Sequence, residues 1–121
     1  MRFLCKLLIA ASSLAFVSNA VFAADSGTVT CSFYSTKYDG RRTANGQRFS
    51  SNAMTAASRT LAFGTRVRLT NPRNHRSVIV RVNDRGPFVK GRDISITRHA
   101  AQRLGFLHSG VAQLQMETLG K

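Results

Sequence analysis

Acidic residues and cysteines are scarce in this sequence. Among 121 residues, five Asp and Glu stand against 18 Lys and Arg, which gives a formal net charge of +13. The two cysteines are Cys5, in the leader segment described below, and Cys31, which therefore lacks a partner for an intramolecular disulfide. Cys31 alternates with Val29 and Phe33, so we expect it to be a small core residue and not a reactive thiol.

Motifs for metals and nucleic acids are also missing. His75, His99 and His108 have no metal-type spacing with Cys or acidic residues, so we expect no metal and no cofactor. The arginines are scattered between Arg41 and Arg103, and neither a recognition helix nor an aromatic and basic repeat accompanies them. The composition therefore argues against nucleic acid as the partner.

The first 24 residues have the three parts of a secretory signal peptide. Arg2 and Lys6 precede the apolar stretch of residues 7–17, and a polar stretch of small residues follows. We expect residues 1–23 to be removed as a signal peptide. This leaves residues 24–121 as the mature domain, which we expect to be periplasmic or secreted.

Cleavage is expected after Ala23, with Ala20 or Ala24 as the alternatives. The uncharged run of residues 7–24 has only 18 residues and is diluted by polar side chains, whereas a spanning helix needs roughly 20 mostly apolar residues. An uncleaved anchor is the alternative to cleavage. After cleavage we expect no stable membrane insertion, because no later segment is apolar enough to span a bilayer.

The mature domain is small and strongly basic. Its 98 residues suffice for one domain with a modest core, and we expect a monomer without a second module. Removing Arg2 and Lys6 lowers the count of basic residues from 18 to 16 and leaves the five acids, so the net charge is +11. Such a charge attracts anionic partners. In the cell envelope these include the carboxylates of peptidoglycan and the phosphates of lipopolysaccharide. A merely solvated basic surface is the simpler interpretation of most of this charge.

Alternating apolar and polar residues predict a mainly β fold. Strands are predicted at residues 28–34, 65–70, 77–82, 93–96 and 111–119. Residues 53–57 fit either a helical turn or a buried strand. Closure of about six strands into a barrel would remove the exposed sheet edges.

One helix, one tight turn and one long loop complete the prediction. Thr97 is the expected N-cap of a helix over residues 98–104, with Gly105 as its stop. Residues 71–74 are Asn-Pro-Arg-Asn and are expected to turn between the two strands of a hairpin. Residues 35–51 are polar and contain glycines, and loops of this length in a compact domain tend to be functional.

Four motifs in order resemble those of a known family. They are GRRTANG at residues 40–46, MTAA at 54–57, TLAFGT at 60–65 and VRVNDRGPF at 80–88. Their order and spacing resemble the rare lipoprotein A (RlpA) type of domain over about residues 27–119. The resemblance implies a six-stranded double-psi β-barrel with one or two short helices, related to the fold of expansins. It also implies endolytic lytic transglycosylase activity on peptidoglycan glycan strands stripped of their stem peptides.

Asp84 is the best candidate for the general acid/base of such a reaction. A lytic transglycosylase protonates the glycosidic oxygen while the sugar's own C6 hydroxyl attacks the anomeric carbon, so one carboxyl group can give a proton and take one back. Ordinary glycoside hydrolysis instead uses two carboxyl groups. Asp84 ends a predicted strand just before the sharp turn at Gly86 and Pro87. The alternative is a structural role, in which Asp84 pairs with Arg85 or accepts backbone N–H bonds within the turn.

Further site residues are expected within the same motifs. The predicted substrate-binding residues are Arg41, Thr43, Asn45, Gln47, Ser58, Asn83 and Arg85. Asn83 and Arg85 are expected to shape the site around Asp84. Tyr34, Tyr38 and Phe88 have aromatic faces that suit stacking on sugar rings, although Phe88 after a tight turn fits a core position equally well.

Several positions depart from the family pattern. Gln47, Ser50, Ser58 and Ser95 stand where the family commonly has carboxylates or a histidine. Polar contacts with sugar remain available at these positions, but proton transfer is lost. The departures favour a second hypothesis, a non-catalytic, expansin-like barrel that binds cell-wall glycan. A third hypothesis is a secreted basic protein that binds envelope polyanions through charge alone, with an affinity that salt would screen.

Overall fold

The structure, a computed structural model, describes residues 26–121. The expected signal peptide at residues 1–23 and its cleavage site lie outside the described residues. Within the described part, no helix is long and apolar enough to cross a membrane.

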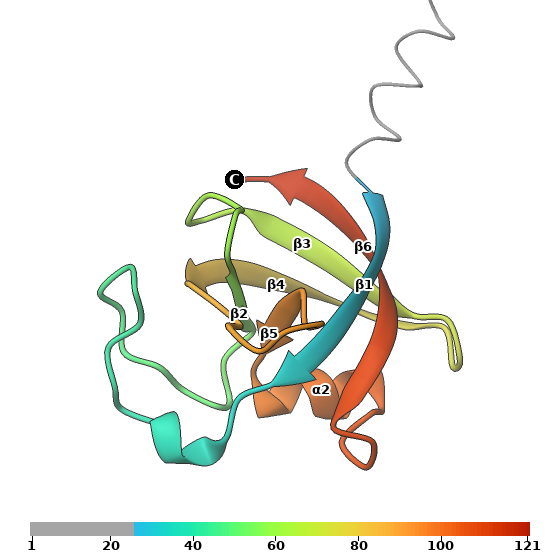
Figure 1. The fold of residues 1–121 in the computed structure, drawn as a ribbon, viewed down its shortest axis with the longest axis horizontal. Coiled ribbons are helices and arrows are strands. Elements are labelled where there is room, and N and C mark those ends of the chain that lie inside the picture. Colours follow the sequence, from blue (N-terminus) through green and yellow to red (C-terminus); the bar gives the residue numbers. More distant parts are fainter. Residues whose placement is uncertain (1–25) are drawn as a thin grey trace, which may run out of the picture.

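The described residues form a closed barrel of six strands (Figure 1). The strands are β1 (Ser26–Phe33), β2 (Thr55–Ser58), β3 (Arg66–Asn71), β4 (Arg76–Asp84), β5 (Ile94–Ile96) and β6 (Val111–Gly120). Around the barrel they follow the order β1-β5-β2-β4-β3-β6. The pairs β1/β5 and β2/β4 are parallel, and the other neighbouring pairs are antiparallel. The prediction of a mainly β barrel of about six strands is confirmed.

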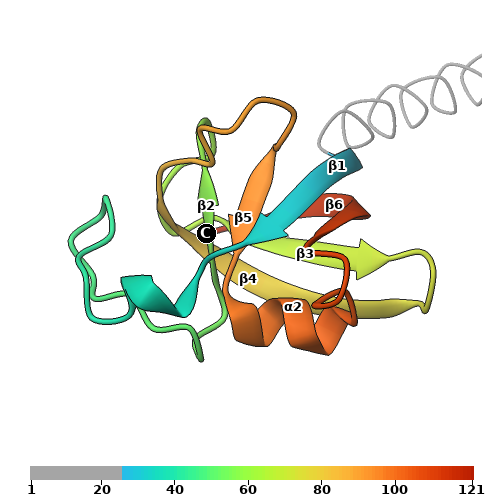
Figure 2. The ribbon, with the colours of Figure 1, turned by 60° about the horizontal axis from the view of Figure 1, so that its bottom comes forward.

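Two short helices accompany the barrel, and the second of them, over residues 98–104, is the helix that the sequence predicts. The 3-10 helix η1 (Thr36–Tyr38) lies in the long loop, and the α-helix α2 (Arg98–Leu104) contacts β4 and β1. Figures 1 and 2 show that the η1 loop and the β3–β4 hairpin extend from opposite sides of the barrel. For residues 53–57 the sequence fits either a helical turn or a strand. In the structure these residues contain the start of strand β2, which pairs with both β4 and β5.

The core fills the barrel with the inward side chains of the alternating strands. Val67 and Leu69 of β3 and Val80 and Val82 of β4 are almost completely buried, because every second residue of a strand faces the same side. Cys31 is fully buried as well, which confirms the prediction of a core residue. Burial raises the pKa of the Cys31 thiol, so the side chain stays a neutral thiol.

Helix α2 has the predicted caps at both ends. The Thr97 hydroxyl accepts a hydrogen bond from the Ala100 N–H at 3.3 Å and donates one to the Ala53 carbonyl at 2.5 Å. Gly105 ends the helix in the left-handed region at φ 82°. A Cβ at this position would lie 2.7 Å from the Asn74 amide nitrogen, so any other residue there would have to displace the Asn74 side chain as well as adopt a positive φ.

The turn of the β3–β4 hairpin binds the end of the same helix. Asn71 and Asn74 each donate a side-chain hydrogen bond to the Leu104 carbonyl at 2.9 Å. The Asn71 side chain also accepts a bond from the Arg73 N–H at 3.0 Å. The Leu104 carbonyl, one of those that a helix leaves without a partner at its end, is thus satisfied from the hairpin.

Replacing Asn71 with Ala is expected to lower the free energy of unfolding by about 1–3 kcal/mol, because a buried amide and its partners lose their hydrogen bonds. Chemical denaturation measures the change. Asn52→Ala is the matched control, since Asn52 is exposed and its side chain makes no recorded hydrogen bond in residues 26–121. A change within about 0.5 kcal/mol is expected for the control. Equal losses in both variants would contradict the role of Asn71.

Candidate functional site

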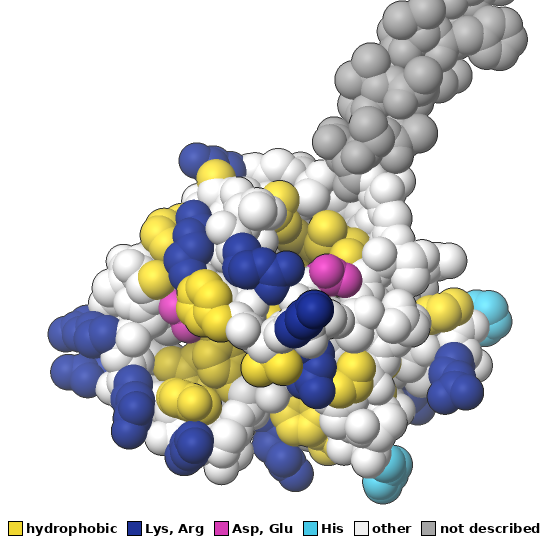
Figure 3. All heavy atoms as spheres, viewed as in Figure 1, with side chains coloured by type: hydrophobic (Ala, Val, Ile, Leu, Met, Phe, Trp, Pro, Cys, Tyr) yellow, Lys and Arg dark blue, Asp and Glu magenta, His cyan; other side chains and the backbone are white. Residues whose placement is uncertain are grey.

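A groove of about 560 Å³ lies where the ends of β1 and β4 meet the η1 loop and residues 85–92. Its lining includes Tyr34, Tyr38, Arg41, Asp84 and Phe88. Among the described residues that line it, Asp84 is the one carboxylate. Figure 3 shows hydrophobic side chains in hollowed parts of this side of the molecule, with many Lys and Arg side chains and few acidic ones around them.

Three hydrogen bonds orient the Asp84 carboxylate at the end of β4. The Tyr34 hydroxyl donates to Oδ2 at 2.5 Å. The backbone N–H groups of Ala44 and Arg85 donate to Oδ1 at 2.8 Å and 2.9 Å. These donors come from the end of β1, the long loop and the turn itself, so segments far apart in the chain converge on this side chain.

Tyr34 is held in place by two other aromatic rings. It stacks on Phe49 with ring centroids 4.6 Å apart and meets Tyr38 edge-on at 6.0 Å. Burial, together with the hydrogen bond to Asp84, raises the pKa of the Tyr34 phenol above its ordinary value. The phenol therefore stays protonated at neutral pH and remains a donor to Asp84.

The guanidinium of Arg85 points away from Asp84. It donates to the carbonyls of Ser58 at 3.0 Å and Leu61 at 2.8 Å, and it lies 3.9 Å from the centre of the Phe63 ring. The suggested pairing of the Arg85 side chain with Asp84 is therefore wrong, because the guanidinium is already bound to backbone carbonyls. The other half of that structural alternative holds, since Asp84 does accept a backbone N–H bond within the turn, from Arg85.

Four predicted site residues form a hydrogen-bonded network beside the groove. The Thr43 hydroxyl donates to the Asn45 side chain at 2.6 Å. The side-chain amides of Asn45 and Asn83 both donate to the side-chain oxygen Oε1 of Gln47 at 3.1 Å. The Asn45 N–H also donates to the Asn83 backbone carbonyl at 3.2 Å. This network fastens the long loop to the end of β4 and so supports the position of Asp84.

The predicted site residues fall into three groups by place. Arg41, Thr43, Asp84 and Arg85 line the groove. Asn45, Gln47 and Asn83 lie beside it in the network described above, outside the lining. The structure does not bring Ser58 into the groove: its hydroxyl accepts from the N–H groups of Thr60 and Leu61 at 3.2 Å and 3.0 Å, and the residue is buried.

Arg92 and Val89 also line the groove, although no motif pointed to them. The signal in the sequence was the turn at Gly86 and Pro87, after which Val89 and Arg92 follow along the same groove. Phe88 lines the groove and is 81% exposed, so the core position suggested as its alternative is not adopted. Within residues 26–121, no group of three or more His, Cys, Asp or Glu side chains is arranged to hold a metal ion.

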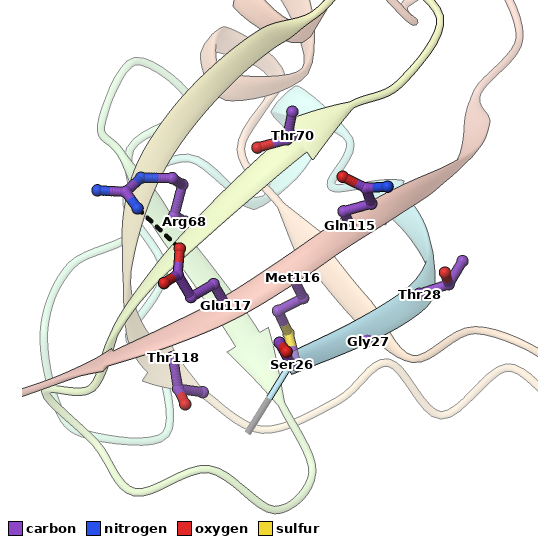
Figure 4. Close-up of a pocket in the computed structure, with 9 residues that line it drawn as sticks. All are labelled: Ser26, Gly27, Thr28, Arg68, Thr70, Gln115, Met116, Glu117 and Thr118. Carbon is purple, nitrogen blue, oxygen red and sulfur yellow. Dashed lines mark hydrogen bonds and ion pairs between the residues drawn. The ribbon is translucent and has the colours of Figure 1, made fainter. Parts of the chain in front are cut away.

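A second hollow of about 510 Å³ runs along β1, β3 and β6 (Figure 4). Its lining is mostly polar and includes Thr28, Thr70 and Gln115. Arg68 and Glu117, which are paired on the neighbouring strands β3 and β6, form an ion pair at 2.7 Å in its lining, and both side chains are about half exposed. None of the predicted site residues lies there, so the groove at Asp84 is the better candidate site.

The closed mixed barrel of six strands, together with the family match given next, identifies a double-psi β-barrel domain, and Asp84 at the end of a strand lines its groove. The chain belongs to the lytic transglycolase family of such domains, whose model matches residues 15–116. The predicted RlpA resemblance and the predicted double-psi fold are both confirmed by this match and by the relatives below.

Curated relatives share up to about three fifths of the aligned residues. A Nostoc sp. protein named "Probable endolytic peptidoglycan transglycosylase RlpA" is 58% identical over 84 residues, covering 69% of this chain and 23% of the relative. The Pasteurella multocida "Endolytic peptidoglycan transglycosylase RlpA" is 51% identical over 88 residues, covering 73% of this chain and 30% of the relative. The chain thus spans less than a third of the length of these relatives.

Solved structures share the fold. A Clavibacter michiganensis expansin variant in complex with cellohexaose has a TM-score of 0.63 and 17% identity, covering 78% of this chain and 50% of the expansin. The Streptomyces papain inhibitor has a TM-score of 0.62 and 19% identity, covering 78% of this chain and 94% of the inhibitor. At these identities the likeness concerns the barrel alone.

Proposed function

We propose that this chain is an endolytic lytic transglycosylase domain that cleaves peptidoglycan glycan strands, with Asp84 as the general acid/base. The observation that carries the proposal is the Asp84 carboxylate, the one acid lining the groove among the described residues, oriented by three hydrogen-bond donors. The names of the RlpA relatives, endolytic peptidoglycan transglycosylases, support the reaction class.

The two oxygens of Asp84 have different roles in this proposal. Oδ1 accepts two backbone N–H bonds, which use both of its lone pairs. Oδ2 accepts only the Tyr34 hydroxyl, so it keeps a lone pair for substrate. Oδ2 is therefore the oxygen that carries the proton to be transferred.

The reaction needs one carboxyl group and no water. Protonated Asp84 gives its proton to the glycosidic oxygen as the bond to the anomeric carbon breaks. The C6 hydroxyl of the same sugar then attacks the anomeric carbon, and the Asp84 carboxylate takes the hydroxyl proton. One product ends in a 1,6-anhydro ring, the other in a free hydroxyl, and Asp84 returns to its starting form.

The setting of the reaction belongs to the same proposal. Residues 24–121 act as one domain after removal of residues 1–23, in the periplasm or outside the cell, as a monomer. The partner is the glycan strand, and no nucleic acid, metal or cofactor takes part. The net charge of +11 expected for this domain suits a polymer that carries carboxylates.

Purified mature protein, incubated with glycan strands whose stem peptides have been removed, is expected to release fragments with 1,6-anhydromuramoyl ends. Mass spectrometry distinguishes these ends from reducing ends, which contain one more water. A boiled sample of the same protein is the control. Fragments with only reducing ends would overturn the transglycosylase mechanism, and the absence of any fragments would overturn the proposed cleavage.

The second hypothesis, a non-catalytic glycan-binding barrel, has one specific observation in its favour. Ser58 and Ser95, which stand where the family commonly has ionisable residues, offer the groove no group that moves a proton at neutral pH. Ser58 is moreover turned into the chain by two backbone hydrogen bonds. Binding to intact sacculi at physiological salt without any released fragment would favour this hypothesis over cleavage.

A further inference from the structure

Phe88 and Val89 form an exposed apolar edge of the groove. Phe88 is 81% exposed and Val89 is 58% exposed, although large apolar side chains are usually found inside a domain. Both residues line the groove that contains Asp84. We refer to residues 87–89 as the apolar lip. A contiguous exposed apolar surface beside a polar groove is typical of a ligand-binding edge.

Hydrogen bonds to backbone carbonyls hold the apolar lip in place. One nitrogen of the Arg59 guanidinium donates to the Pro87 carbonyl at 2.6 Å and to the Arg92 carbonyl at 2.7 Å. The Arg92 N–H closes the turn by donating to the Val89 carbonyl at 3.2 Å. The backbone that carries Phe88 is therefore braced on both sides of this residue.

The groove also presents arginines that lack a carboxylate partner. The guanidinium of Arg41 lies 5.6 Å from the centre of the Tyr38 ring. Arg92 also lines the groove and belongs to the segment that follows the apolar lip. Neither side chain forms an ion pair with another residue in the range 26–121, where the recorded pair is Arg68 with Glu117. The groove is thus complementary to a ligand that carries negative charge.

We propose that Phe88 and the arginines of the groove determine which glycan it binds, with one pyranose ring stacked on Phe88 and a carboxylate of the glycan bound by Arg41 or Arg92. The apolar C–H face of a sugar ring fits an exposed aromatic face. A planar guanidinium fits a carboxylate in two parallel hydrogen bonds. The proposal rests on the proposed function for the identity of the glycan, whose muramyl sugars carry a lactyl carboxylate once the stem peptide is removed.

Binding is tested in an Asp84→Asn background, so that the ligand is not consumed. The probes are peptide-free muramyl oligosaccharides and chitin oligosaccharides of equal length, which lack the carboxylate. Titration calorimetry at physiological salt gives each Kd. The Asp84→Asn protein, which is the parent of the variants below, is expected to bind the muramyl probe more tightly than the chitin probe. Equal affinities for the two probes, or no binding of either, would overturn the proposal.

Phe88→Ala is expected to weaken binding of both probes by about tenfold, because both have pyranose rings to stack. Phe88→Tyr should bind like the parent. Ile79→Ala is the matched control: Ile79 is also an exposed apolar residue, at 44%, but it lies on β4 outside the groove lining. No change in Kd is expected for it. Equal Kd values for Phe88→Ala and Ile79→Ala would overturn the stacking role.

Replacing Arg41 and Arg92 together with Gln is expected to weaken binding of the muramyl probe by about tenfold and leave chitin binding unchanged. Equal weakening of both probes would overturn the recognition of the carboxylate. The outcome is independent of cleavage. If wild-type protein releases no fragments but these binding differences hold, the proposed function fails and the inference stands. If wild-type protein releases fragments but Phe88→Ala binds both probes normally, the proposed function stands and the stacking role of Phe88 fails.

Discussion

Replacing Asp84 with Asn is expected to lower the rate of glycan cleavage by about 10²- to 10⁴-fold, the range that general acid–base catalysis contributes. Binding of the glycan should change by less than about threefold, because the substitution removes a proton donor and leaves the shape of the groove. Initial rates follow from counting 1,6-anhydro ends by mass spectrometry, and affinity follows from calorimetry.

The hydrogen bonds of Asp84 explain why Asn is the right replacement. An amide oxygen at the place of Oδ1 still accepts from the N–H groups of Ala44 and Arg85. The amide nitrogen at the place of Oδ2 can donate to the Tyr34 oxygen, because a hydroxyl also accepts. The local structure is therefore preserved, and a loss of rate reports on the chemistry.

Asp93→Asn is the matched control for this experiment. Asp93 also accepts a backbone bond, from the Thr30 N–H at 2.8 Å, but it lies outside the groove lining. Cleavage by this variant is expected at the wild-type rate. If Asp84→Asn kept more than about a tenth of the wild-type rate, Asp84 would not be the general acid/base.

The fold was predictable because its signals are local. Alternation of apolar residues marks β3 and β4 by their buried valines, and Thr97 and Gly105 mark both ends of α2. The short strand β2 gave no such signal, because Ala56 and Ala57 are both buried and no alternation is visible. Only its pairing with β4 and β5 defines it as a strand.

The candidate site was predictable only in part, because side-chain direction depends on contacts between distant segments. Asp84 could be chosen from its position at the end of a strand. The direction of Arg85 could not, since its partners, the carbonyls of Ser58 and Leu61, are 27 and 24 residues away in sequence. Gln47 bonds to side chains on both the loop and β4, which no spacing in the motif reveals.

The contact between Tyr34 and Asp84 is the most consequential feature that the sequence did not predict. The two residues are 50 positions apart and meet because β1 and β4 end at the same side of the barrel. The sequence indicates only an aromatic face for sugar stacking at Tyr34. Its hydroxyl instead fixes the carboxylate oxygen that faces substrate in the proposed reaction, which makes Tyr34 a positioning residue.

Replacing Tyr34 with Phe is expected to lower kcat by about 10- to 100-fold and to change KM by less than about threefold, because Oδ2 of Asp84 loses its fixed donor while the ring stays stacked on Phe49. In the wild-type protein, the raised pKa of Tyr34 keeps the phenol protonated. Its deprotonation therefore should not add an alkaline limb to the rate profile below about pH 10, the ordinary phenol value.

A double variant separates this positioning role from a general structural one. If Tyr34 acts through Asp84, then Tyr34→Phe should not slow the Asp84→Asn variant further, since the oxygen it positions no longer transfers a proton. If instead the two losses multiply, Tyr34 supports the reaction by another route and the positioning role is wrong. Thermal unfolding of Tyr34→Phe provides the check on folding, because a large fall in Tm with unchanged kcat would leave Tyr34 a structural residue only.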